Sequence, residues 1–273
     1  MKKLTATLCL TVALLANCQS VVSEEYKEIY TREDVTISFI KNTPSNGIRA
    51  AAILFAGGDG DIGIDVENKT VVSDNFLVRS RSLFSKNGFL TLTPDLPSDM
   101  DGVKNDRGNT DYGTDISFLV KQIRKQTSKP IWLVGTSRGS ITVSYHAAAL
   151  DIQGVALTAT VTSGNKDTVF DGYLEKIKVP ALIVHHENDQ CVSSPAEGVK
   201  EIMGALINSP KKKLLLFREG ESGGSNDCGP ISPHGFLGIE NKVIGTMSDW
   251  MFKAKGENKS NQLKAVTLQQ LNK

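Results

Sequence analysis

The sequence carries almost no net charge, few aromatic residues and few cysteines. Its 31 Lys and Arg residues balance 30 Asp and Glu residues, so the formal net charge is +1. That balance excludes nucleic-acid binding driven by bulk positive charge, and it excludes an acidic disordered chain. Aromatic residues make up 6% of the chain, which argues against a stacking platform for single-stranded nucleic acid. Four cysteines in 273 residues are too few for a disulfide scaffold.

No apolar run reaches the length of about 20 residues that a membrane-spanning helix needs. The first 20 residues instead have the pattern of a signal peptide, with Lys2 and Lys3 followed by an apolar run from Leu4 to Leu15. The segment that ends at Cys18 is similar to a bacterial lipobox, in which a lipid is attached to the cysteine. Asn17 departs from that pattern, so ordinary signal cleavage stays open. We expect an exported protein, either a periplasmic or outer-envelope lipoprotein or a secreted one.

The rest of the chain alternates between strand-like and helix-like patterns. Residues 35–41 alternate polar and apolar side chains, which is typical of an exposed edge strand. Short apolar runs typical of buried strands occupy residues 50–56, 89–93, 131–134, 155–161 and 181–184. Helices are predicted over residues 114–126, 140–150 and 243–252. The alternation predicts one α/β domain over residues 24–254, with a mostly parallel sheet covered by helices on both faces, and a polar tail over residues 255–273.

A G-x-S-x-G motif spans Gly135 to Gly139, between a predicted buried strand and a predicted helix of small residues. In that context Ser137 lies on a tight turn with its hydroxyl raised above the sheet edge, and the flanking glycines let the turn close. A plain helix N-cap is the alternative interpretation, because serine is a favoured capping residue. With this motif, residues 35–252 resemble the α/β-hydrolase superfamily. The resemblance implies an α/β-hydrolase fold and Ser137 as the nucleophile.

A serine hydroxyl needs a base to take its proton, and the superfamily carries an acid and a histidine after the serine. His234 lies in a loop shortly before the last predicted helix, where the superfamily carries its catalytic histidine. His146 lies on the helix that follows the serine motif, and His185 and His186 end a buried strand. The resemblance therefore implies that His234 is the base.

Asp189 lies shortly after the strand that ends at the two adjacent histidines, where superfamily members often carry the acid. Such a carboxylate holds the imidazole in the correct tautomer. Glu187 stays open as an alternative, whereas Asp171 precedes the strand. His185, His186 and Asp189 are also residue types that ligate zinc. Adjacent strand residues point to opposite faces of a sheet, however, which argues against a shared metal ion.

Acyl transfer also needs hydrogen-bond donors for the oxyanion that develops on the substrate. The resemblance implies the backbone N–H of Arg138, the residue after the nucleophile, as one donor. The second donor is expected after the 50–56 strand, where Ala56-Gly57-Gly58 aligns with the superfamily's His-Gly-x segment and Ala56 replaces the histidine. We favour the N–H of Gly58, with that of Asp59 as the alternative.

Two other motifs overlap this loop. Residues 58–63 match the dinucleotide fingerprint G-x-G-x-x-G after a strand. Asp59 and Asp61 would place negative charge beside a pyrophosphate, however, and no clear helix follows. Asp59, Asp61 and Asp65 also miss the spacing of an EF-hand calcium loop. We expect neither ligand at this loop.

Cys191 follows the predicted acid by two positions, and Cys228 precedes His234 by six. If the fold is as the resemblance implies, their two loops meet at the active site. We expect a disulfide between them, with two buried free thiols as the alternative, because an exported chain permits disulfides.

The resemblance implies an ester hydrolase that acts on a small-molecule ester or acyl substrate, with no cofactor, no metal and no nucleic-acid partner. A peptidase or thioesterase on the same scaffold, or a binding protein that keeps the fold, are the alternatives. Residues 164–179 can hold one short helix, over residues 168–176, and no cap domain. We therefore predict an open cleft at Ser137, screened by loops 57–69 and 97–112, which are rich in Gly, Asp and Asn and are expected to be mobile.

Overall fold

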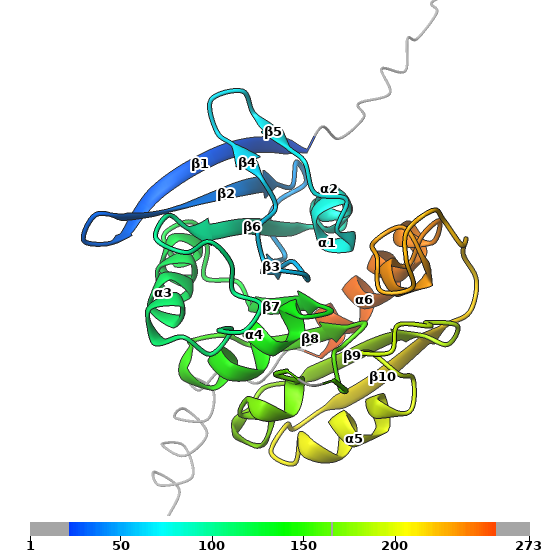
Figure 1. The fold of residues 1–273 in the computed structure, drawn as a ribbon. Coiled ribbons are helices and arrows are strands. Elements are labelled where there is room, and N and C mark those ends of the chain that lie inside the picture. The colour runs from blue at the N-terminus through cyan, green and yellow to red at the C-terminus, as the bar shows by residue number, and fades with distance from the viewer. Residues whose placement is uncertain (1–21, 165, 255–273) are drawn as a thin grey trace, which may run out of the picture.

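The computed structural model describes residues 22–164 and 166–254, so the predicted signal peptide, Cys18 and the 255–273 tail lie outside the described residues. An eight-stranded sheet forms the centre, in the order β1-β2-β6-β3-β7-β8-β9-β10 (Figure 1). Its strands are β1 (Ser23–Arg32), β2 (Val35–Thr43), β3 (Ala50–Phe55), β6 (Phe89–Pro97), β7 (Ile131–Thr136), β8 (Gly154–Thr158), β9 (Ala181–His186) and β10 (Lys212–Phe217). The β1–β2 and β2–β6 pairs are antiparallel, and the other five pairs are parallel. The predicted mostly parallel sheet is confirmed.

Each predicted buried strand is present, but the predicted edge strand is not at the edge. β2 is covered on one side by β1 and on the other by β6, so the prediction of an exposed edge is wrong. Neither β1 nor β10 is predicted from the sequence pattern. Both are edge strands. β1 carries several exposed charged side chains that hide the pattern of a strand, whereas β10 has two exposed lysines followed by an apolar run over residues 214–217, a strand signal that the prediction missed.

β6 is longer than the sequence predicts. The prolines at positions 94 and 97 mark the end of the predicted strand, yet β6 continues through both. The antiparallel pairing with β2 shifts register between Ile37 and Phe39, and Phe39 lies opposite Pro94. Prolines are tolerated in a strand at such irregularities, because their missing N–H interrupts a ladder that is already disturbed.

Helices cover both faces of the sheet, as predicted, and β3 shows why both faces are apolar. Its side chains at positions 51, 53 and 55 belong to a core cluster shared with α3, α4 and α5. Those at positions 50, 52 and 54 belong to a second cluster shared with α1, α2 and α6. Figure 1 shows these two groups of helices on opposite sides of the sheet. The helices are α1 (Phe76–Arg79), α2 (Arg81–Lys86), α3 (Thr110–Arg124), α4 (Gly139–His146), α5 (Gly198–Ala205) and α6 (Glu240–Lys253).

Small elements complete the fold. A short hairpin of β4 (Ile64–Asp65) and β5 (Thr70–Val71) follows the loop after β3. The 3₁₀ turns are η1 (Ala147–Ala149), η2 (Val169–Asp171), η3 (Leu174–Lys176) and η4 (Pro233–Gly235). The connection from β8 to β9 therefore holds the two 3₁₀ turns η2 and η3 in place of the predicted helix over 168–176. Val169 and Leu174 anchor these turns in the core beneath the sheet.

Candidate active site

Ser137 lies between β7 and α4 with a backbone φ of 51°, a left-handed conformation that is uncommon for a residue other than glycine. The turn is tight and requires glycine at both flanking positions. A side chain at Gly135 would overlap the backbone of Gly139, and a side chain at Gly139 would overlap the carbonyl oxygen of Phe55. Strained backbone of this kind is tolerated where the surrounding structure enforces it, and it concentrates at functional sites. The side chain of Ser137 makes no N-cap hydrogen bond to α4, whose N-cap is Arg138. The N-cap interpretation of Ser137 is therefore wrong.

Asp189 and His234 form a buried, hydrogen-bonded pair. Asp189 lies three residues after β9 and is 7% exposed, and His234 lies in η4 and is 4% exposed. Asp189 Oδ2 accepts a hydrogen bond of 2.8 Å from His234 Nδ1. The N–H of Cys191 donates to the other carboxylate oxygen at 2.9 Å. These two donors hold the carboxylate in one orientation toward the imidazole.

The second ring nitrogen of His234 is free to accept a proton. Nε2 is buried and has no hydrogen-bond partner among the described residues. Because Nδ1 donates to a carboxylate, a neutral imidazole carries its proton on Nδ1 and a lone pair on Nε2. This tautomer is the one a general base requires.

The turn that carries His234 is built locally and then tied to α1. Ser232 Oγ accepts from the His234 N–H at 3.2 Å, and Pro233 opens η4. Arg79 of α1 donates to the carbonyl oxygen of Gly235, and Phe236 packs on Phe76 with 4.9 Å between ring centroids. The histidine loop is therefore docked against the helix that follows the 57–75 segment.

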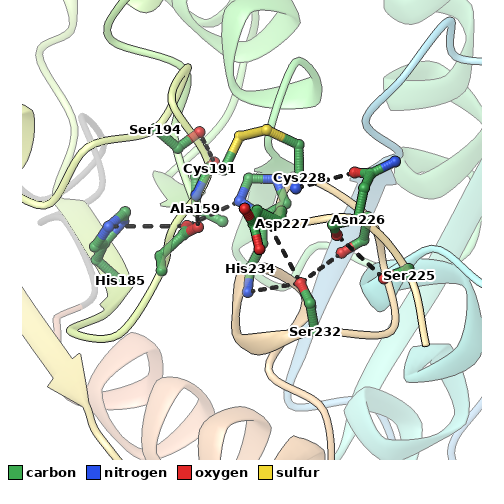
Figure 2. Close-up of a disulfide and its surroundings, with 12 residues drawn as sticks. Ala159, His185, Cys191, Ser194, Ser225, Asn226, Asp227, Cys228, Ser232 and His234 are labelled. Atoms are coloured by element: carbon green, nitrogen blue, oxygen red, sulfur yellow. Dashed lines mark hydrogen bonds and ion pairs between the residues drawn. A yellow bond between two sulfur atoms is a disulfide. The ribbon is translucent and has the colours of Figure 1, made fainter. Parts of the chain in front are cut away.

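A disulfide between Cys191 and Cys228 joins the loop of Asp189 to the loop of His234 (Figure 2). The predicted pairing is confirmed, and the alternative of two free thiols is wrong. Cys191 is buried, whereas Cys228 is an exposed residue. The bond closes a segment of 37 residues and brings together the two loops that carry the paired carboxylate and imidazole.

Residues weighed as alternatives have other partners. Glu187 forms an ion pair with Arg218, and Asp171 accepts from the backbone N–H of Thr168 in a capping box. His146 Nε2 lies 2.8 Å from the carbonyl oxygen of Arg107. None of these three groups contacts the Asp189–His234 pair.

His185 and His186 differ in their surroundings, as adjacent strand residues should. His186 is hydrogen-bonded by its two ring nitrogens to the carbonyl oxygen of Glu219 and the N–H of Asn188. His185 is fully buried, with Nε2 3.9 Å from Asp189 Oδ2, and neither ring nitrogen has a hydrogen-bond partner among the described residues. Burial lowers the pKa of His185, so the ring is neutral near pH 7. This contact with Asp189 is not predicted from the sequence.

The loop after β3 lies against the serine. A side chain at Gly57 would have its Cβ 2.9 Å from Ser137 Cβ and 3.2 Å from the carbonyl oxygen of Thr136. Gly58 follows with a φ of 60°. Neither the N–H of Gly58 nor the N–H of Arg138 makes a hydrogen bond to another residue that the structure describes. Among the described residues, the two amides named as oxyanion donors thus have no hydrogen-bond partner, and they belong to segments in contact.

The acidic residues in and near the loop after β3 form hydrogen bonds and ion pairs within the protein. Asp95 accepts from the N–H groups of Ile62 and Ile64 at 3.0 and 2.7 Å, which anchors the base of the β4–β5 hairpin. Asp61 accepts from the N–H of Gly63, and Asp59 pairs with Lys104. A hairpin rather than a helix follows the loop, so the dinucleotide fingerprint lacks the helix it requires.

Solved structures share this architecture. The match to an α/β serine hydrolase without lid from Xanthomonas campestris has a TM-score of 0.60 at 14% identity, covering 86% of this chain and 97% of that one. An esterase from Pyrococcus furiosus has a TM-score of 0.64 at 13% identity, with 86% and 92% covered. A dienelactone hydrolase from Anabaena variabilis has a TM-score of 0.62 at 14% identity, with 86% and 99% covered. The chain has the α/β-hydrolase fold. Its sequence matches no protein-family profile and no curated protein.

In many proteins with the α/β-hydrolase fold, a cap is inserted in the β8–β9 connection. Here the described part of that connection, which omits residue 165, holds η2 and η3 and no cap domain. The prediction of a fold without a cap is confirmed. None of the helices in the described residues has the length and apolar character that a membrane crossing requires.

Proposed function

We propose that this protein is a serine hydrolase that acts on carboxylic esters, with Ser137 as nucleophile, His234 as base and Asp189 as the residue that orients His234. One observation carries the proposal. Ser137, in its left-handed conformation, follows β7. Asp189 follows β9, and His234, its buried hydrogen-bond partner, lies after β10. The carboxyl ends of these three parallel strands lie at one edge of the sheet. Open α/β sheets bind their ligands at this edge.

The chemistry follows from the positions of the protons. His234 Nε2 takes the proton of Ser137 Oγ as the oxygen attacks the ester carbonyl carbon, and the carbonyl electron pair moves to the oxygen. The N–H groups of Gly58 and Arg138 donate to that oxyanion. When the intermediate collapses, the imidazolium gives its proton to the departing alcohol, and an acyl group stays on Ser137. Water, activated by the same imidazole, then releases the acid.

We favour an ester substrate over an amide or a thioester because of how the structural neighbours are described. These are described as esterases, serine hydrolases and a dienelactone hydrolase. The described part of the connection after β8 holds no cap domain, and this favours a small soluble ester over a lipid droplet.

The test of the proposal is Ser137→Ala, assayed on a series of p-nitrophenyl esters of increasing acyl length. We expect a loss on the order of 10³-fold or more in kcat, with an unchanged far-UV circular dichroism spectrum, because only a hydroxyl is removed. Ser117→Ala on α3 is the matched control and should keep full activity. Near-normal turnover by a clean preparation of Ser137→Ala would refute the mechanism. Wild-type protein that fails to react with a fluorophosphonate probe would indicate a binding protein, and faster turnover of acyl-CoA or peptide amides would change the substrate class.

We further propose that the chain is exported and that its disulfide forms in an oxidising compartment. The signal-peptide pattern of the first 20 residues and the Cys191–Cys228 bond support this. Mass analysis of the N-terminal peptide from the envelope fraction distinguishes a lipid on Cys18 from cleavage near Ser20. Recovery of the active protein from the cytoplasm with Met1 still attached would contradict export.

A further inference from the structure

Arg107 is a fully buried arginine that joins the loop after β3 to helix α4. Its Nη1 donates to the carbonyl oxygen of Ala56 at 3.2 Å and to Thr142 Oγ1 at 2.9 Å. Its Nη2 donates to the carbonyl oxygen of Gly58 at 2.9 Å. One side chain thus holds the loop on both sides of Gly57, and fastens it to the helix that begins two residues after Ser137.

These hydrogen bonds fix the orientation of the peptide that carries the Gly58 N–H. The carbonyl oxygens of Ala56 and Gly58 accept from Arg107, and that of Gly57 accepts from the N–H of Gly60 at 3.2 Å. A peptide unit is planar, and its N–H points opposite to its C=O. Because the Gly57 carbonyl is held on one side, the Gly58 N–H is held on the other, where it has no internal partner among the described residues.

Arg107 has no hydrogen-bonded counter-ion in the part of the chain that the structure describes. No carboxylate within residues 22–164 or 166–254 forms an ion pair with the guanidinium, and its Nε is buried without a partner. Burial lowers the pKa of Arg107 to about 10, which still leaves the group charged near pH 7. The charge of Asp59 raises the pKa of Arg107, but that carboxylate is exposed and pairs with Lys104 at 3.6 Å. The positive charge of Arg138 opposes the effect of Asp59. A buried cation without a counter-ion is costly for stability. This cation donates to the carbonyl oxygen of Gly58, the residue whose N–H is the expected oxyanion donor.

We propose that Arg107 positions and polarises the oxyanion site, so that its buried guanidinium, which donates only to neutral acceptors, gains a counter-charge in the negative oxygen that forms when Ser137 attacks an ester. This inference deepens the proposed function and rests on it. As the Oγ–carbon bond forms, the C=O electron pair moves to oxygen and the proton passes to His234 Nε2. The guanidinium gains a nearby counter-charge at that moment. It therefore stabilises the transition state more than the ground state, which is the condition for raising kcat.

Three variants separate this role from plain support of the fold. Arg107→Met removes both the charge and the loop hydrogen bonds, whereas Arg107→Lys keeps the charge and loses the two-pronged contact. Thr142→Val is the matched control, because it removes the hydrogen bond to α4 and leaves both loop carbonyls in contact with the guanidinium. Each variant is characterised by its melting temperature, its kcat and KM on a short p-nitrophenyl ester, and its inhibition by an alkylboronic acid. That acid adds to a reactive serine as a tetrahedral anion and so mimics the charged intermediate.

For Arg107→Met we expect kcat to fall by about 10²- to 10³-fold, as for loss of an oxyanion donor, with KM within about threefold of the wild-type value. The boronate inhibition constant should rise by a similar factor to the loss in kcat/KM. Arg107→Lys should fall between Arg107→Met and wild type, and Thr142→Val should stay within about threefold of wild type in kcat.

Several results would overturn the proposal. A folded Arg107→Met with wild-type kcat, or with unchanged boronate affinity, shows that Arg107 does not act on the charged intermediate. A Thr142→Val variant as impaired as Arg107→Met assigns the effect to packing against α4. If Arg107→Met does not fold, Arg107→Gln decides, because it removes the charge and keeps a hydrogen-bond donor, and wild-type kcat with wild-type boronate affinity in that variant overturns the proposal. Activity in Ser137→Ala refutes the proposed function itself, whereas an inactive Ser137→Ala beside an unimpaired Arg107→Met refutes this inference alone.

Discussion

Removal of the Cys191–Cys228 bond should lower the free energy of unfolding by about 4 kcal/mol. The bond closes a segment of 37 residues, and the chain-entropy relation for a loop of that size gives about 13 cal/mol/K, or about 4 kcal/mol near 25 °C. For a domain of this size, that change corresponds to a fall of about 8–15 °C in melting temperature. The mechanism acts on the unfolded chain, which becomes less restricted when the bond is absent.

Activity should fall as well, because the bond joins the two loops that hold the Asp189–His234 pair. The N–H of Cys191 donates to Asp189 Oδ1, so a loop that moves at Cys191 moves the carboxylate with it. A displacement of about 1 Å in such a site can lower turnover by up to about 10²-fold. Since Cys228 is an exposed residue, we expect a phosphine reductant to reach the bond in the native protein.

The assay compares wild type, wild type with reductant, and the Cys191→Ala/Cys228→Ala double variant in urea unfolding. The two routes of bond removal should agree in free energy, and both should give a slightly larger m-value because the unfolded chain becomes less compact. Mass analysis first establishes that the wild-type bond is fully formed. A loss below about 1 kcal/mol from a fully bonded wild type would refute the loop-closure account.

Three further outcomes follow from the site and its surroundings. Asp189→Asn should lower kcat on the order of 10⁴-fold without unfolding the protein, because the amide no longer fixes the correct imidazole tautomer, and a loss under tenfold in steady-state assays would contradict this. Gly57→Ala should lower kcat sharply, because its Cβ would lie 2.9 Å from that of Ser137, and unchanged kinetics would show that the loop yields. Burial lowers the pKa of His185 and of His146, so the unfolded chain takes up their protons first as pH falls below about 6.5. Stability measured in urea should therefore be full above that pH and decline below it, and His146→Gln should reduce the decline.

The sequence predicts the elements of the site better than it predicts its supports. The motif around Ser137 lies between a buried strand and a helix of small residues, and these local signals fix a tight turn without knowledge of the rest of the chain. His234 and Asp189 are placed by their order relative to strands and the last helix, which a superfamily resemblance supplies. Their pairing then follows from the topology, because β9 and β10 are parallel neighbours whose following loops begin side by side.

Hydrogen bonds that residues distant in the sequence make to the site leave no local sequence pattern by which to predict them. Arg107 lies in a segment rich in Gly, Asp and Asn, a composition that predicts a mobile loop. In the fold this segment is bound to the loop after β3, through the guanidinium and through the N–H of Val103, which donates to the carbonyl oxygen of Asp59 at 2.7 Å. An arginine with no charged partner shows its role only when the carbonyls that accept from it are known. β1 is also missed by the prediction, because its charged sequence lacks the apolar pattern of a strand.

The loop after β3 and the segment that carries Arg107 are held in the same way, by side chains that bind their backbone. Asp95 holds two N–H groups at the base of the β4–β5 hairpin, and Arg107 holds two carbonyls of the loop before it. The Asp95 carboxylate accepts from backbone N–H groups, and the Arg107 guanidinium donates to two backbone carbonyls and to Thr142 Oγ1, so peptide groups of both polarities are fixed. Amides aimed in advance at a developing charge lose no energy to reorientation when that charge appears. The described part of the β8–β9 connection holds two 3₁₀ turns and no cap domain, so under the proposed function the order of the site has to come from these loops.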